Sequence, residues 1–344
     1  MQYYKSHHLA IFLFFSGFLL SLFINSFRDM IGGYDIYIYA QYFENVKENG
    51  NFLKYESGYY FLNLLLYNIY PNRYFLFFVI GFLLLLSFLF FSIKVTKRLA
   101  FFVFFLIFCK LYFYTFVYLR QILAVVIVWF GFYFLFKGNR RFFLIFIALG
   151  SLFHISALIG IVVLFAKKIF NIKSVILIFI LGLVLGFFVN TQQIFMILGG
   201  FFDNNRLISN SNNNNLVNYF YFLEAVSIYI WLMLRYDFYK KENYRNQMIF
   251  NLSLIYVFLN LLTINDATSL RMTWFFLIGP ILFFLNELNS NIKQKGILFF
   301  GIIIYFSIIF IRIMIVWDGG DFLPYKSIFQ DEPRFGRWEF LEYR

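Results

Sequence analysis

The sequence predicts an all-α polytopic membrane protein, with about 10–11 transmembrane helices of roughly 20 residues each. Hydrophobic residues make up 62% of its 344 residues and charged residues only 13%, whereas soluble globular domains carry about 25% charged residues. The mean hydropathy is +0.75, and long apolar runs recur along the chain. Lipid must therefore solvate most of this surface, and we expect a single integral membrane domain over residues 1–344.

The predicted spans follow one another along the chain, separated by more polar segments. They lie near residues 9–26, 74–93, 99–119, 121–136, 174–189, 218–235, 247–263, 270–287 and 296–316. The run 58–70 is also apolar, but Pro71 ends it before it reaches spanning length, so we expect an interfacial helix there. No small-residue cleavage site follows the first span, which indicates an uncleaved anchor rather than a signal peptide.

The Lys and Arg residues predict which way the spans run. About half of the chain's 29 basic residues lie in five short loops, which begin at Lys94, Lys137, Lys167, Arg235 and Lys293. Because basic loops remain in the cytoplasm, all five should face inward, and the N-terminus with them. The same bias accounts for the net charge of +12, so we expect no nucleic-acid partner. The external parts would then be 27–73, a short turn near Arg120, the Asn-rich loop 190–217, the turn 264–270 and the C-terminal tail 317–344.

The run 142–166 must enter the membrane and return if this orientation holds. It separates the second basic loop from the third, and a single crossing would put Lys167 and Lys168 outside. A re-entrant or broken hairpin removes the conflict, with its turn in the polar stretch from Gly150 to Ser156. Non-helical backbone is tolerated at membrane depth only where protein buries it or it lines a wet cavity. The alternative is one long tilted helix that violates the charge rule locally.

A few charged and polar residues interrupt the apolar runs, and they mark a candidate functional site. Arg120 with Gln121, His154 and Arg271 all fall near the outer membrane face in the predicted topology. Ionisable groups at membrane depth are costly, so each is a functional candidate by default. Two guanidiniums suit a phosphate or pyrophosphate, because their rigid forks pair with anionic oxygens. An imidazole and a nearby carboxylate such as Glu56 suit proton transfer.

Each of these residues also has a structural explanation. Arg120 fits an interfacial side chain that snorkels to the lipid headgroups, and Arg271 fits an interface anchor at the start of a span. His154 fits a buried histidine bonded to a backbone carbonyl, and Glu56 fits a solvated loop carboxylate. The residues taken one at a time leave these alternatives open.

Several classes of chemistry have no support in the sequence. It contains no P-loop, no Gly-rich nucleotide fingerprint and no H-E-x-x-H motif. Its one cysteine, Cys109, lies in an apolar run, so neither a disulfide framework nor zinc-type spacing is present. We therefore expect no metal and no cofactor.

Short motifs connect the candidate residues over most of the chain, roughly residues 28–326. They are Asp35 with Tyr39, Glu56-x-Gly58-Tyr59 with Leu62-Asn63, Leu119-Arg120-Gln121 with Ala124, Phe153-His154-x-Ser156-Ala157, Arg271 ahead of Pro280, and Leu323-Pro324-Tyr325. In their order and spacing the chain resembles the EpsG/Wzy-type polysaccharide polymerases of bacterial inner membranes. Ser57 departs from the pattern, because many relatives carry proline there; this loosens the turn but keeps the acid.

The resemblance implies glycosyl transfer at the outer face of the bacterial cytoplasmic membrane. A growing chain would move from undecaprenyl pyrophosphate onto an incoming lipid-linked repeat unit, in capsule, O-antigen or exopolysaccharide biosynthesis. Glu56 or His154 would deprotonate the attacking hydroxyl, and Arg120 and Arg271 would bind pyrophosphate. Sugar binding would fall to Asp35, Tyr59, Gln121 and Tyr325. The implied partners are membrane lipid, the lipid-linked oligosaccharide, a flippase and a chain-length regulator.

Three other functions compete with this interpretation. A lipid-linked glycan flippase or exporter would be expected to show inverted repeats and a polar cavity open to both leaflets, whereas here the polar groups gather on one side. A membrane O-acyltransferase could use His154 as its base, but its reaction would give Arg120 and Arg271 no function. An O-antigen-type ligase shares the donor and differs in the acceptor, so the sequence separates it poorly.

The inward orientation of the basic loops can be tested by chemical labelling. Single cysteines that replace Lys94, Arg141, Lys168, Lys240 or Lys293 should resist an impermeant thiol reagent in intact cells, because basic loops face the cytoplasm. Single cysteines within 203–214 should react with the reagent. Labelling of position 168 from outside would contradict the re-entrant hairpin.

Overall fold

The computed structural model describes residues 2–48, 56–96, 110–166, 170–188, 219–265, 269–289, 295–315, 322–323 and 325–330. Within these ranges the regular secondary structure is helical, apart from one isolated antiparallel bridge between Arg28 and Ser327. The chain divides into two compact units. The first holds Met1–Tyr133, Ile145–Leu158 and Ser290–Arg344, and the second holds Phe134–Leu144 and Ile159–Asn289. The expected all-α fold of a polytopic membrane protein is confirmed.

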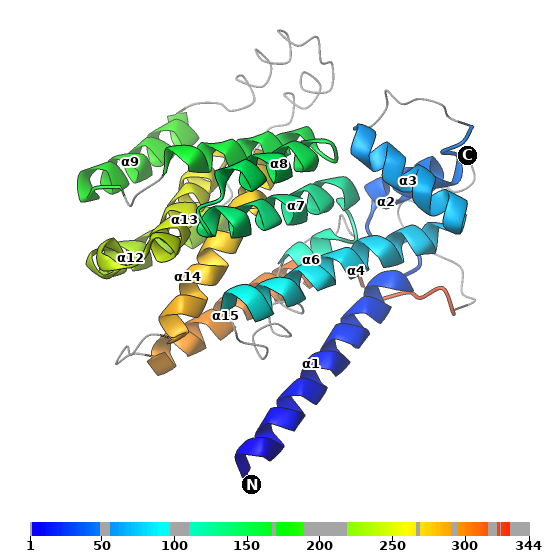
Figure 1. The fold of residues 1–344 in the computed structure, drawn as a ribbon, viewed down its shortest axis with the longest axis horizontal. Helices are drawn as coiled ribbons and strands as arrows, with labels where there is room; N and C mark the ends of the chain where they lie inside the picture. Colours follow the sequence, from blue (N-terminus) through cyan, green and yellow to red (C-terminus); the bar gives the residue numbers. More distant parts are fainter. Residues whose placement is uncertain are drawn as a thin grey trace. The chain divides into compact units, whose positions relative to one another are not determined.

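The first unit carries the helices that matter most for the site. They are α1 (Gln2–Ser26), α2 (Tyr34–Glu44), α3 (Ser57–Ile69), α4 (Arg73–Phe91) with a π-helical turn at Ser92–Thr96, α6 (Lys110–Tyr114), most of α7 (Leu119–Phe136) and α15 (Lys295–Ile315). Helix α1 packs along α4, and α2 and α3 pack against each other and against α4 (Figure 1). Pro71 follows the end of α3, and the Asn72 side chain accepts a hydrogen bond from the Tyr74 backbone N–H at 2.8 Å, which caps α4.

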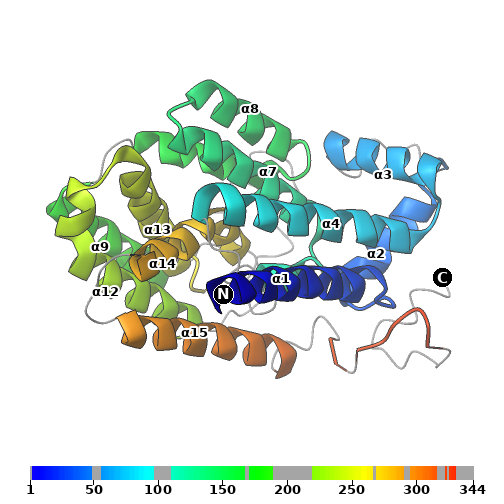
Figure 2. The same cartoon turned by 60° about the horizontal axis from the view of Figure 1, so that its bottom comes forward.

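The second unit is organised around one buried helix, α13 (Tyr244–Leu262). Around it pack α9 (Ile172–Phe188), α12 (Tyr219–Lys241), α14 (Ile278–Asn289) and the 3-10 helix η4 (Ser269–Phe276) (Figure 1 and Figure 2). Helix α9 approaches α13 so closely that a Cβ on Gly186 would lie 1.9 Å from the Leu261 carbonyl oxygen. Small residues at such crossings let helix backbones meet within a membrane.

In the residues that the structure describes, the predicted spans coincide with helices, except for the turn at Thr115–Val117 near the end of the predicted span 99–119. Four described helices are long and apolar enough to cross a membrane: Arg73–Val95, Leu119–Phe136, Ser269–Leu288 and Gly296–Ile315. Shorter apolar helices occupy Ile11–Ser26, Ile155–Phe165 and Ile172–Phe188, and α12 and α13 cover two further predicted spans. Helix α3 has 13 residues and is about 20 Å long, so it is too short to cross.

Other expectations fall wholly or partly outside the described residues. The Asn-rich loop 190–217 lies outside them, as do most of the predicted span 99–119 and most of the tail 317–344. The turn that we expected at Arg120 is displaced: Thr115–Val117 form the turn, and Arg120 belongs to the first turn of α7. The displacement is a few residues, which is the usual error when helix ends are assigned from sequence.

The run 142–166 is broken where the hairpin turn was expected. Helix α8 (Arg140–Ser151) stops, residues 152–154 form a turn, and the 3-10 helix η2 (Ile155–Phe165) follows. A Cβ on Gly150 would lie 3.2 Å from the Cβ of Ala157. In a continuous helix these positions would be about 10 Å apart, so the chain folds back between them. Whether both ends of the hairpin face the cytoplasm stays a prediction.

The tip of this hairpin docks on the beginning of α3. The Gly58 backbone N–H donates a hydrogen bond to the Leu152 carbonyl at 2.8 Å. A backbone carbonyl left open by the break is thereby satisfied. Gly58 lies two residues after Glu56, and Leu152 lies two residues before His154, so this bond joins the two segments that carry the proton-transfer candidates.

We predict that Gly58→Ala loosens this contact. The added Cβ would lie 2.8 Å from the Leu152 carbonyl oxygen and 2.9 Å from its Cβ. Overpacking of this kind should lower the free energy of unfolding by about 1–3 kcal/mol, measured as a lower unfolding temperature in detergent. Gly301→Ala on α15 is the matched control, because nothing lies within 4 Å of its Cβ position. Equal unfolding temperatures for Gly58→Ala and the unmodified protein would contradict the docking.

Candidate functional site

A cluster of aromatic side chains around Tyr59 packs next to the candidate site. The Tyr59 ring, on α3, is fully buried. It lies edge-on to Tyr39 of α2 at 5.8 Å and stacks on Tyr42 at 6.3 Å, centroid to centroid. Leu119 at the start of α7 belongs to the same core, and Phe153 at the hairpin tip packs against it. Four segments distant in sequence therefore meet at one place in the first unit.

An ion pair between Glu56 and Arg120 lies at this meeting point. Glu56 immediately precedes α3 but makes no side-chain capping bond to that helix. Its carboxylate instead accepts a hydrogen bond from Nη1 of Arg120. The Arg120 Nε donates to the Tyr39 hydroxyl at 3.4 Å, and the guanidinium carbon lies 5.8 Å from the Tyr39 ring centroid. The two side chains keep 17% and 23% of their surface exposed, so a ligand can reach both.

The hairpin tip brings Phe153, and with it the segment that carries His154, to the same cluster. His154 is half-buried and directly precedes η2. Its Nδ1 lies 2.6 Å from the Ser156 hydroxyl oxygen and accepts a hydrogen bond from the Ser156 backbone N–H at 3.3 Å. The bond between Gly58 and Leu152 fixes the backbone on the other side of the tip. Glu56, Arg120 and His154, which the sequence marked separately, thus belong to one unit, and the bond between Gly58 and Leu152 joins the segments of Glu56 and His154.

The expected sugar-binding residues take different positions. Asp35 is half-buried in the first turn of α2, and Gln121 is 4% exposed in the first turn of α7. Tyr59 is wholly buried, so in this structure its ring packs against its neighbours rather than presenting a face to a ligand. The Tyr325 hydroxyl donates to the Ile24 carbonyl at 3.0 Å, and burial raises the pKa of this hydroxyl. Tyr325 therefore ties the tail to the end of α1.

Arg271 belongs to the second unit. It is half-buried within η4, beside the buried residues Thr273 and Trp274. Its convergence with Arg120 on one pyrophosphate stays a prediction.

The structure completely buries one arginine, Arg28, that the sequence had not singled out. Arg28 lies between the rings of Phe77 and Phe116, with its guanidinium carbon 4.4 Å and 4.6 Å from their centroids. It donates to the Asn25 side chain at 2.8 Å and to the Ile31 carbonyl at 3.2 Å. Burial lowers the pKa of the Arg28 guanidinium to about 9, so the cation persists at neutral pH. No periodic pattern reveals this role, because the aromatic partners lie on other elements.

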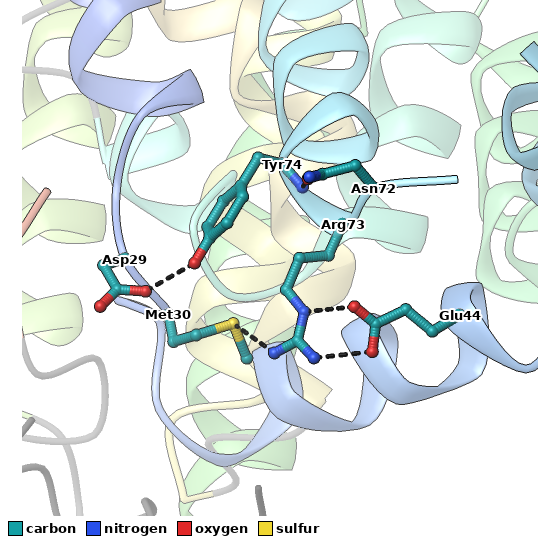
Figure 3. Close-up of polar contacts among 6 residues, drawn as sticks. All are labelled: Asp29, Met30, Glu44, Asn72, Arg73 and Tyr74. Atoms are coloured by element: carbon teal, nitrogen blue, oxygen red, sulfur yellow. Dashed lines mark hydrogen bonds and ion pairs between the residues drawn. The ribbon is translucent and has the colours of Figure 1, made fainter. Parts of the chain in front are cut away.

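A second arginine–glutamate pair also escaped the sequence reasoning (Figure 3). Arg73 at the start of α4 forms a bidentate ion pair with Glu44 of α2. Its Nε donates to Oε1 at 2.5 Å and its Nη2 donates to Oε2 at 2.6 Å. The Tyr74 hydroxyl donates to Asp29 at 2.7 Å. These bonds use both available oxygens of Glu44, so the arrangement fastens α2 to α4.

The arrangement around Glu56 offers three kinds of chemistry in one place. Arg120 supplies a cationic fork for anionic oxygens, Glu56 a carboxylate and His154 an imidazole. Within the described ranges no group of three or more His, Cys, Asp and Glu side chains could hold a metal ion. The residues present therefore suit anion binding combined with proton transfer.

The comparisons with known proteins give one positive result. The family model described as "EpsG family" matches residues 11–327 of the chain. No curated protein matches it, and no solved structure matches it.

The ion pair yields a stability prediction. Glu56→Gln and Arg120→Gln each leave a partly buried charge without its partner, whereas the double variant removes both charges. The double variant should therefore be more stable than the sum of the single losses implies. We expect a coupling energy of about 0.5–3 kcal/mol, measured by chemical unfolding in detergent. Additive losses would show that the two side chains do not interact.

Proposed function

The chain belongs to the EpsG family, and from this premise we propose that it polymerises lipid-linked glycan repeat units. The donor is a growing glycan on undecaprenyl pyrophosphate, and the acceptor is a repeat unit on a second carrier. The reaction takes place at the outer face of the cytoplasmic membrane, and the N-terminus lies in the cytoplasm. Capsule, O-antigen or exopolysaccharide is the product class.

The observation that carries the proposal is the partly exposed pair of Arg120 and Glu56 beside the hairpin tip. Lipid pyrophosphate is already a good leaving group, so the protein needs to bind its charge and to accept one proton. Arg120 presents the planar fork that matches phosphate oxygens, and Arg271 serves as a second pyrophosphate ligand. The carboxylate and the imidazole stand ready for the proton transfer.

The pairing of Arg120 with Glu56 also gives the site a resting state. While the pair is closed, Arg120 holds the Glu56 carboxylate through a hydrogen bond and keeps it from an acceptor hydroxyl. An arriving pyrophosphate competes for the same fork and releases Glu56 from it. Glu56 thus becomes available as a base only when the donor is bound. The site then does not deprotonate an acceptor hydroxyl in the absence of a donor.

The other residues have supporting roles in this proposal. Tyr39 orients Arg120 through its hydroxyl and its ring, and Tyr59 holds Tyr39 in place. Asp35 and Gln121 contact the sugars, and Tyr325 shapes the edge of the site through its bond to α1. A flippase delivers the repeat units, and a chain-length regulator acts on the product.

A flippase and an O-antigen-type ligase remain the alternative functions. The gathering of Glu56, Arg120 and His154 in one unit favours a reaction centre over a transport path. A ligase would use the same donor site and a different acceptor. The assay below separates all three.

The test is polymerisation by purified protein in detergent. Given only repeat units linked to undecaprenyl pyrophosphate, the protein should build a ladder of longer glycans without nucleotide sugar and in the presence of a chelator. Detergent removes the two compartments, so a flippase would yield no ladder. A ligase would need a separate acceptor. No ladder from folded protein with the native repeat unit would overturn the proposal.

Conservative arginine variants sharpen this test. Arg120→Lys and Arg271→Lys should each lose most polymer, because lysine cannot make a bidentate fork. Arg73→Lys is the matched control, since Arg73 forms a comparable pair with Glu44 in the same unit but has no role in the reaction. Near-normal polymer from Arg120→Lys and Arg271→Lys would return both residues to the role of interface anchors.

A further inference from the structure

Two groups of Ser156 converge on a single nitrogen of His154. The Ser156 hydroxyl oxygen lies 2.6 Å from Nδ1, and the Ser156 backbone nitrogen lies 3.3 Å from the same atom. A backbone N–H can only donate. Nδ1 therefore accepts this long bond, and the much shorter contact makes the Ser156 hydroxyl the stronger of its two partners. The hydroxyl can rotate to donate to the same lone pair.

The tautomer of the neutral ring follows from this arrangement. Neutral imidazole has one N–H and one lone-pair nitrogen, so a lone pair on Nδ1 places the hydrogen on Nε2. The bond made by one ring nitrogen in this way determines what the other can do. The basic nitrogen of the neutral ring is then Nδ1. It is bonded within the same turn, to Ser156, and so is not the nitrogen offered to a substrate.

We propose that Ser156 is a positioning residue that holds His154 as the Nε2–H tautomer, so that His154 donates a hydrogen bond to the departing pyrophosphate. Glu56 is then the base. This inference rests on the proposed glycosyl transfer and deepens it, because it divides between two residues a role that the sequence left open. The hairpin supports the division, since the bond between Leu152 and Gly58 fixes the backbone next to His154.

The transfer forms one bond and breaks another. The acceptor hydroxyl oxygen forms a bond to the anomeric carbon of the donor sugar, and its proton passes to the Glu56 carboxylate. The bond from that carbon to the pyrophosphate oxygen breaks, and its electron pair stays on the oxygen. The His154 Nε2–H and the Arg120 guanidinium stabilise the charge that develops there.

The tautomer can be measured directly, without any activity assay. The chain has 3 histidines, and His7→Gln with His8→Gln leaves His154 as the single one. In protein labelled with ¹⁵N-histidine, protonated and unprotonated ring nitrogens give well-separated resonances. We expect Nε2 protonated and Nδ1 unprotonated at a pH where the ring is neutral. A hydrogen on Nδ1 would overturn the proposal, whatever the enzyme's activity.

Serine variants test the positioning role. Ser156→Ala should bring a measurable population of the Nδ1–H tautomer, and Ser156→Thr, which keeps the hydroxyl, should restore the original spectrum. Ser151→Ala is the matched control, because the Ser151 hydroxyl bonds the Ala148 carbonyl within α8 at 2.7 Å and should leave the spectrum unchanged. An unchanged spectrum in Ser156→Ala would remove Ser156 from this role.

Substitution of His154 itself distinguishes a donor from a base. His154→Gln keeps an N–H near the place of Nε2 but has no basic nitrogen. If His154 is a donor, polymerisation should fall only about tenfold, whereas loss of a general base lowers the rate about 10²–10⁴-fold. Glu56→Gln should show the larger loss, and His154→Ala should fall below His154→Gln. Equal loss in His154→Gln and His154→Ala would contradict donation, while absence of polymer from the unmodified protein would contradict the proposed function instead.

Discussion

Lipid and packed protein both exclude water, and this constraint governs the buried polar groups of the protein. A buried charge or backbone carbonyl must find its partner within the chain, because an unsatisfied one costs several kcal/mol. Arg28 meets the requirement with two aromatic faces, an amide and backbone carbonyls. Arg120 meets it with Glu56 and Tyr39. The first arrangement is fully buried and holds the fold together, whereas the second keeps enough exposed surface to be exchanged for a ligand.

The same constraint explains why the broken hairpin and the short helix α3 belong together. A break in a helix at membrane depth frees backbone groups, and the Leu152 carbonyl is satisfied by Gly58 only because a glycine permits so close an approach. The contact that stabilises the break also places His154 near the start of α3, where Glu56 lies. One backbone bond therefore both satisfies the broken helix and joins the two segments of the proposed site.

The sequence predicted the helical fold, the break in 142–166 and the candidates Glu56, Arg120 and His154, because hydropathy, charge bias and isolated ionisable residues are visible one position at a time. The structure then gathered these three in one unit. It also showed what no local pattern reveals. Arg28 depends on rings from two other elements, and Tyr59, expected to face a sugar, is buried. Partners brought together by packing alone carry no periodic signal in the chain.

The central claim is that Arg120 exchanges Glu56 for the pyrophosphate of the lipid donor. A cryo-EM structure of the protein in a lipid nanodisc with undecaprenyl pyrophosphate would test it most directly. The account predicts phosphate oxygens at about 3 Å from the Arg120 guanidinium nitrogens, with the Glu56 carboxylate released from them. A pyrophosphate bound elsewhere, with the ion pair between Arg120 and Glu56 intact, would contradict it.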